Sequence, residues 1–93
     1  MIRVLVADDD QLMQAGLIEL LGADTTIEVV GRAATGAEAV RLTESLAPDV
    51  VLMDVRMPGG DGISATAEIT KRGSTARVLV LTTFDDDEYV FGA

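Results

Sequence analysis

The stretch IRVLVADDD, residues 2–10, decides how this chain folds. Its first six residues are a short apolar, β-branched run, which is typical of a strand buried on both faces of a parallel sheet. The run stops at three consecutive aspartates. A second run of this kind, DVVLMD over residues 49–54, also ends in a carboxylate, Asp54. If the two strands are neighbours, their carboxyl ends bring these acidic side chains to one edge of the sheet.

The residues after Asp10 change to a helical period. One apolar stripe of this helix is formed by Met13, Gly16, Leu17, Leu20 and Leu21. We expect Asp10 to cap the first turn and Gly22 to end the helix. Residues 27–33 then predict a second strand, and their glutamate and arginine indicate the edge of a sheet.

The rest of the chain continues the alternation. Thr35 and Glu38 match a capping box, which opens a helix that runs up to Pro48. Further expected elements are a loop over residues 58–62, a helix over 63–72 ended by Gly73, a strand over 77–81 and the start of a helix at 85–88. The order βαβαβαβ predicts an α/β fold, a doubly wound parallel sheet with helices on both faces.

Composition narrows the class of protein. The 93 residues suit one small domain, and 48% apolar with 25% charged residues argues against intrinsic disorder. The chain has no cysteine or histidine, which excludes disulfides, the usual zinc sites and a histidine-based triad. A net charge of −9 opposes nucleic-acid binding by this segment. Without an apolar run of the roughly 18–20 residues that span a membrane, and without a signal peptide, we expect a cytoplasmic domain with no membrane contact.

The strand ends predict the chemistry. Asp8, Asp9 and Asp54 would converge with hydroxyl groups from Thr82 and Thr83, which follow the fourth strand. Carboxylates this close repel one another, and hard oxygen ligands suit Mg²⁺. Such a metal would neutralise a phosphoryl group and leave a carboxylate as the nucleophile for in-line attack.

Four motifs occur in a fixed order: VADD (residues 6–9), DVVLMD (49–54), MPGGDG (57–62) and VLVLT (78–82). Over essentially the whole chain, this set resembles the receiver (CheY-like) domain of bacterial two-component response regulators. Residues 78–90 look most like the subgroup whose receiver precedes a LuxR-type helix-turn-helix output domain. The resemblance implies a flavodoxin-like fold with strand order 2-1-3-4, and it places a fifth strand with its lysine and a fifth helix beyond Ala93.

The resemblance also implies the role of each site residue. Asp54 would accept a phosphoryl group from a histidine kinase. Thr82 would hydrogen-bond a phosphoryl oxygen, Thr83 would be the small residue beside it, and Pro58 and Gly62 would shape the loop. The Mg²⁺ ligands would be Asp8, Asp9, Asp54 and the backbone carbonyl of Arg56.

On this interpretation residues 1–93 are a C-terminally truncated receiver domain, and the output domain is not in this chain. The parent protein would be a transcriptional switch, not a turnover enzyme, that forms a homodimer and contacts DNA only through its output domain. We expect the chain alone to leave residues 77–81 as a bare strand edge, with apolar surface around Met13, Leu17 and Leu20. It would therefore pair with a copy, swap elements or fold only in part, which sedimentation equilibrium would reveal.

Two alternatives stay open. Asp8-x-Asp10 after a buried strand is similar to the motif of haloacid-dehalogenase-type phosphatases and phosphotransferases. Gln11 and Leu12 depart from that motif, however, and it leaves Asp54 without a role. The other alternative is a pseudo-receiver, an interaction module that is not phosphorylated, although the intact acidic residues argue against it in the parent protein.

Overall fold

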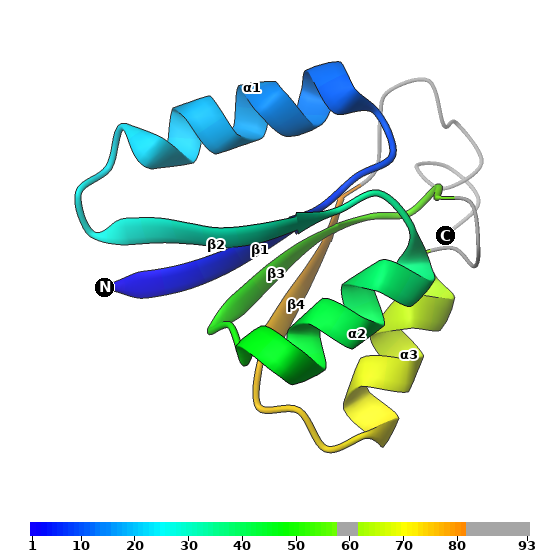
Figure 1. Ribbon diagram of the computed structural model, residues 1–93. Coiled ribbons are helices and arrows are strands. Elements are labelled where there is room, and N and C mark those ends of the chain that lie inside the picture. The colour runs from blue at the N-terminus through cyan, green and yellow to red at the C-terminus, as the bar shows by residue number, and fades with distance from the viewer. Residues whose placement is uncertain (58–61, 82–93) are drawn as a thin grey trace.

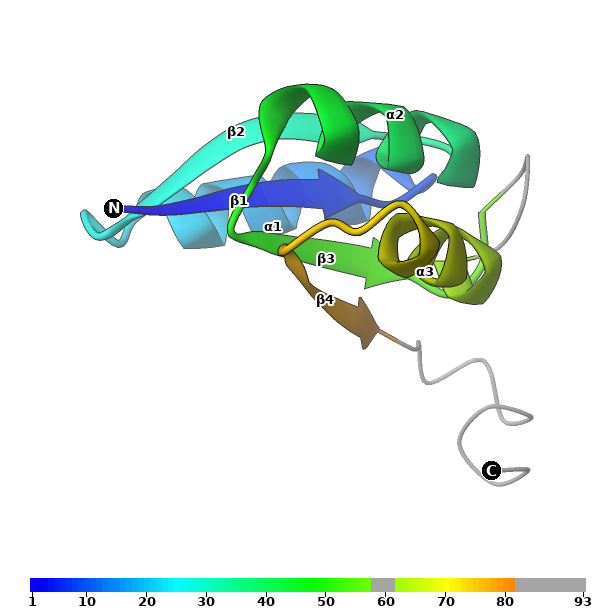
Figure 2. The same ribbon diagram turned by 90° about the horizontal axis from the view of Figure 1, so that it is seen from below.

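The computed structural model describes residues 1–57 and 62–81, which form one parallel sheet flanked by helices. Its elements are β1 (Ile2–Ala7), α1 (Gln11–Gly22), β2 (Ile27–Ala33), α2 (Gly36–Leu46), β3 (Val50–Asp54), α3 (Gly62–Lys71) and β4 (Arg77–Leu81). The sheet order is β2-β1-β3-β4, with α1 on one face and α2 and α3 on the other (Figure 1 and Figure 2). This confirms the predicted fold, strand order and the position of β2 at an edge. The helix expected at residues 85–88 lies outside the described residues.

The sheet is buried mainly through its central strands. Leu5 and Val6 of β1 have no exposed surface, and as neighbours in a strand they point to opposite faces. The main apolar cluster lies between the sheet and the helices α2 and α3, and it consists of Leu5, Ala7, Ala33, Ala39, Val40, Val51, Met53, Met57, Ala65 and Ile69. Met53 and Met57, from two of the four sequence motifs, are both buried in this cluster. Removal of this apolar surface from water stabilises the pairing of β1 with β3.

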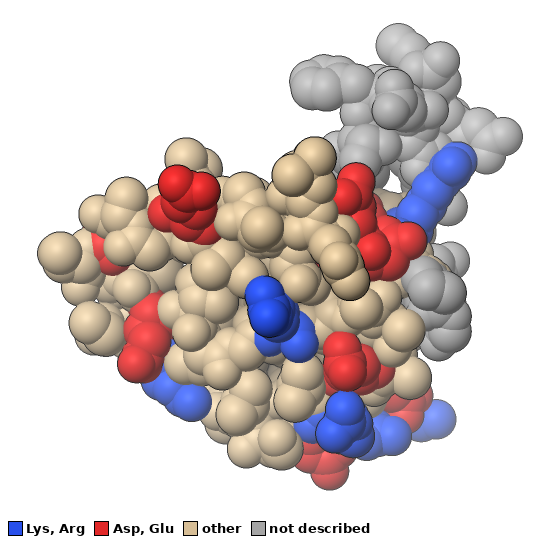
Figure 3. Space-filling view, turned by 45° about the horizontal axis from the view of Figure 1, so that its top comes forward, with Lys and Arg blue, Asp and Glu red and all other residues tan. Residues whose placement is uncertain are grey.

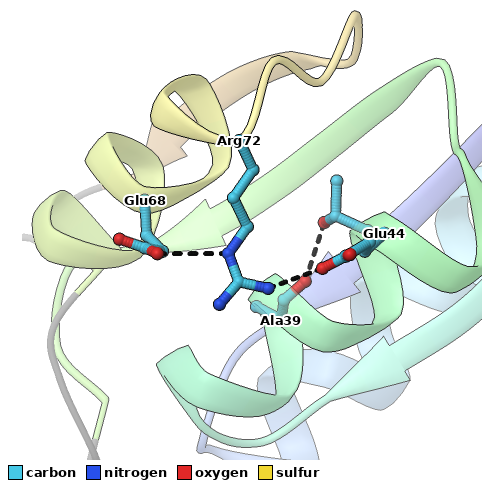
Figure 4. Close-up of polar contacts among 5 residues, drawn as sticks. Ala39, Glu44, Glu68 and Arg72 are labelled. Carbon is cyan, nitrogen blue, oxygen red and sulfur yellow. Dashed lines mark hydrogen bonds and ion pairs between the residues drawn. The ribbon is translucent and has the colours of Figure 1, made fainter.

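An exposed polar contact also joins α2 to α3. The guanidinium of Arg72, the residue that follows α3, donates to the carboxylates of Glu68 on α3 and Glu44 on α2 (Figure 4). The side chains of Arg72 and Glu44 are 48% and 64% exposed, so solvent screens their attraction. The contact therefore orients the side chains of Arg72, Glu44 and Glu68 where α2 meets α3, and it adds little to the stability of the fold.

Helix α1 faces the sheet with only part of the predicted apolar stripe. Gln14 is its one buried side chain, and half-buried Leu17, Ile18 and Leu21 share its side of the helix. From the predicted stripe, Met13 and Leu20 are 47% and 74% exposed, and Gly16 is exposed too. The predicted stripe thus faces the sheet only at Leu17 and Leu21, whereas exposure of Met13 and Leu20 agrees with the apolar surface expected around them in this chain. Apolar residues are spread around this helix, so its sequence has little preference for one face. The helix ends at Gly22, as predicted.

The predicted helix caps are present. The Asp10 carboxylate accepts hydrogen bonds from the backbone N–H groups of Leu12 and Met13, at 3.0 and 3.2 Å. Thr35 Oγ1 accepts from the N–H of Glu38, whose carboxylate in return accepts from the N–H of Ala34. Both caps lie directly after strands, β1 and β2, and so define where the chain turns at the carboxyl edge of the sheet.

Gly62, the first residue of α3, packs against the end of β3. Its N–H donates to the carbonyl of Val55 at 2.7 Å. A Cβ at this position would lie 2.0 Å from the carbonyl oxygen of Asp54, and backbone atoms cannot move aside as a flexible side chain can. The sequence indicates only a turn here, whereas the structure requires glycine so that α3 can approach β3.

Replacing Gly62 by alanine should therefore destabilise the protein strongly. We expect Gly62→Ala to lower the free energy of unfolding by about 3 kcal/mol or more, because the helix and the strand must separate. Gly16→Ala is the matched control, since a Cβ at this exposed helical position meets no atom within 4 Å. It should be neutral or stabilising by up to ~1 kcal/mol. Urea unfolding of both variants checks this, and equal effects would contradict the close packing.

Candidate functional site

The carboxyl ends of β1 and β3 place acidic side chains next to one another. Ala7 pairs with Met53 in the parallel register, so Asp8 and Asp54 emerge side by side. One carboxylate oxygen from each of Asp8, Asp9 and Asp54 lies within 4.8 Å of the others. Asp8 and Asp54 are only 6% and 8% exposed, whereas Asp9 is exposed. The structure thus brings together the three aspartates expected from the sequence to share a site.

These carboxylates line a pocket at this edge of the sheet. Its other lining residues are Asp10, Met13 and Arg56. Acidic side chains gather at the right-hand edge of Figure 3, the side on which β1 and β3 end. Thr82 and Thr83, as well as Pro58, lie outside the described residues. The described part of the pocket is therefore strongly acidic, with Arg56 as its one basic lining residue.

Three hydrogen bonds fix the main chain and carboxylate of Asp8. Its N–H donates to the carbonyl of Ala33 at 2.9 Å, and its carboxylate accepts from the N–H of Asp10 at 2.9 Å. Its carbonyl accepts from the side-chain amide of Gln14 at 3.1 Å, and the same amide nitrogen donates to the Ala33 carbonyl at 3.1 Å. Gln14 was not among the site residues predicted from the sequence. Its one signal is a polar residue on the side of α1 that carries Leu17 and Leu21.

Asp54 is held by its neighbours on both sides. It pairs with Leu81 of β4, and the N–H of the next residue, Val55, donates to the Leu81 carbonyl at 3.1 Å. The main chain of Asp54 also packs against Gly62, as described above. The main chain that carries this carboxylate is thus fixed at the end of the strand.

Burial and mutual repulsion change the acidity of the pair. Burial, and then the charge of Asp8, raise the pKa of Asp54 to about 6, although a hydrogen bond from the backbone of Arg56 partly opposes this. The pKa of Asp8 is also raised, mainly by burial, and the N–H of Asp10 opposes the rise. Both shifts favour a proton or another cation in the pocket.

Asp10 serves a different purpose from the other acids. Its carboxylate caps α1 through Leu12 and Met13. A carboxylate committed to two backbone N–H groups is less available to take part in the chemistry of a phosphatase-type site. This use of Asp10 weighs against that alternative.

The raised pKa of Asp54 makes the stability of the metal-free protein depend on pH. Between the ordinary value of 3.8 and about 6, the folded state binds more protons than the unfolded state. The free energy of unfolding should therefore fall as the pH rises through this window, by at most about 3 kcal/mol from Asp54. Urea unfolding between pH 4 and pH 7 with a chelator present measures this. Asp54→Asn should flatten the dependence, and an unchanged profile in that variant would contradict it.

Comparison with known proteins agrees with this geometry. Residues 4–93 match the response regulator receiver domain family. The chain is 48% identical over 91 residues to the transcriptional regulatory protein LiaR of Bacillus subtilis. The aligned residues make up 98% of this chain and 43% of LiaR. The chain therefore spans less than half the length of this relative.

Two solved structures extend the comparison. A LuxR-family DNA-binding response regulator from Staphylococcus aureus superposes with a TM-score of 0.87 at 28% identity, over 97% of this chain and 75% of that one. CheY in the CheX–CheY–BeF₃–Mg²⁺ complex from Borrelia burgdorferi gives a TM-score of 0.85 at 26% identity, over 96% and 67% of the two chains. No helix in residues 1–57 and 62–81 is long and apolar enough to cross a membrane. The chain belongs to the response regulator receiver domain family, and its relatives include LuxR-type transcriptional regulators.

Proposed function

We propose that Asp54 is the phosphoacceptor of this receiver domain, and that a sensor histidine kinase supplies the phosphoryl group. The observation that carries the proposal is the convergence of Asp54 with Asp8 and Asp9 at the carboxyl edge of the sheet. A carboxylate oxygen of Asp54 attacks phosphorus, a P–O bond forms, and the P–N bond to the kinase histidine breaks. Asp54 suits this role because its backbone is fixed on both sides while its carboxylate lines an open pocket.

The second part of the proposal is a Mg²⁺ site formed by the side chains of Asp8, Asp9 and Asp54 and the backbone carbonyl of Arg56. The donor set fits this ion, because all its members are hard oxygen ligands and Arg56 lines the same pocket. Bound Mg²⁺ would supply positive charge for the carboxylates and the incoming phosphoryl oxygens. The Borrelia burgdorferi CheY structure, solved as a complex with BeF₃ and Mg²⁺, supports this choice of ion.

The third part concerns the whole protein. Relatives of this chain are transcriptional regulators, one of them described as a DNA-binding response regulator. We propose that phosphorylation of Asp54 controls a DNA-binding output domain, with a homodimer as the active form, and that the protein is a switch without catalytic turnover. The roles of Thr82 and Thr83 stay predictions from the family resemblance.

The Mg²⁺ site predicts a localised response to the ion. Addition of Mg²⁺ should shift the amide resonances of Asp8, Asp9 and Asp54 most strongly, because the ion contacts these residues. Asp9→Asn should weaken Mg²⁺ binding roughly tenfold, while Glu28→Gln, which also removes one exposed acid, should leave it unchanged. Shifts centred on residues 85–87 would show that the ion binds elsewhere.

The phosphoacceptor role predicts a specific chemical product. Incubation with the kinase or a small phosphodonor should give an acid-stable, base-labile acyl phosphate on Asp54. Asp54→Asn keeps the shape of the side chain but removes the nucleophile, so labelling should disappear. Glu44→Gln is the control, because Glu44 is an exposed acid on α2 whose contact is with Arg72. Equal labelling of wild type and Asp54→Asn would exclude Asp54 as the acceptor.

A further inference from the structure

Gln14 is a buried amide on a helix whose inner side is otherwise apolar. It is 7% exposed and lies on the side of α1 that carries the half-buried residues Leu17, Ile18 and Leu21. A leucine or methionine would satisfy packing alone at this position, whereas a buried polar group is costly unless it forms hydrogen bonds. Gln14 forms two, both to main-chain carbonyls.

The two carbonyls belong to residues at the acidic site. One is the carbonyl of Asp8, which is part of the peptide group between Asp8 and Asp9. Its orientation therefore affects the direction of both carboxylates. The other is the carbonyl of Ala33, the last residue of β2, which also accepts from the N–H of Asp8. Through Gln14, the turn after β1 is attached to the neighbouring edge strand.

These contacts close a ring of interactions. The carboxylate of Asp8 accepts from the N–H of Asp10, and the carboxylate of Asp10 caps the first turn of α1. That helix carries Gln14, whose amide returns to the carbonyl of Asp8. Asp8 is thereby held at its N–H, its carbonyl and its carboxylate. The ring opposes the repulsion that would otherwise drive Asp8 and Asp9 away from Asp54.

We propose that Gln14 is a positioning residue, whose amide holds the Asp8–Asp9 peptide so that both carboxylates stay beside Asp54 and bind Mg²⁺ together. This inference rests on the proposed function. A purely structural role for Gln14 predicts a different result. In that case, loss of the amide lowers stability but leaves the Mg²⁺ affinity of the folded protein unchanged.

Gln14→Met in the full-length protein separates the two roles. Methionine has a similar length and no charge, but its side chain has no N–H donor. We expect the Mg²⁺ dissociation constant, measured well below the unfolding temperature, to rise roughly tenfold. The rate of Asp54 labelling should fall at limiting Mg²⁺ and recover largely when Mg²⁺ is saturating.

Thr43→Val is the matched control. Thr43 is 3% exposed, and its hydroxyl donates to the carbonyl of Ala39 within α2, at 2.7 Å. The variant removes one buried donor from a helix that contributes no acid to the pocket. Its unfolding temperature should fall, while its Mg²⁺ dissociation constant stays within twofold of the wild-type value.

A measurement on the wild type covers the case in which Gln14→Met does not fold. On saturation with Mg²⁺, the side-chain amide resonances of Gln14 should shift more than those of Gln11, the exposed glutamine of the same helix. Unchanged Gln14 resonances would overturn the inference. So would a Gln14→Met variant that folds and binds Mg²⁺ within twofold of wild type, while wild-type binding and labelling leave the proposed function intact. If the wild type neither binds Mg²⁺ nor labels Asp54, both fail.

Discussion

The parallel register between β1 and β3 is the constraint on which the acidic site depends. Ala7 lies opposite Met53, so the next residues along the two strands are both carboxylates. A slip of one residue would turn every side chain of a strand to the other face of the sheet. The burial of Leu5 against Val51 opposes such a slip. At the other end of the strands, the Asp49 carboxylate accepts from the N–H of Arg3 at 2.8 Å. Apolar packing thus determines where the charges lie.

The same register creates an electrostatic cost at neutral pH. Asp8 and Asp54 are both largely buried, and burial raises the pKa of each. Each pKa unit corresponds to about 1.4 kcal/mol of preference for the neutral form. A domain chosen for stability alone would place an amide or an apolar residue at one of these positions. The site is therefore a place where stability and ligand binding have opposite requirements.

Much of this arrangement could be predicted from residue patterns, because it depends on local or strongly periodic signals. The apolar runs of β1 and β3, the Asp10 cap and the pair Thr35–Glu38 each have one reasonable interpretation. The contacts of Gln14 and Gly62 depend on which elements meet in three dimensions, and a single sequence carries little information about this. The face of α1 was not predictable for a related reason, since its apolar residues do not select one side.

The constraints around the acids also limit how the site can respond to its own charge. The contacts of Asp10, Gln14 and Ala33 hold Asp8 on one side. On the other side, the pairing with β4 and the close approach of Gly62 hold the main chain of Asp54. Since neither strand end can move away, the repulsion between the carboxylates is relieved mainly by a bound proton or cation. Because the main chain is fixed, the repulsion among the carboxylates favours the binding of positive charge. Of Asp8, Asp9 and Asp54, the exposed Asp9 is best able to adjust its side chain to the bound cation.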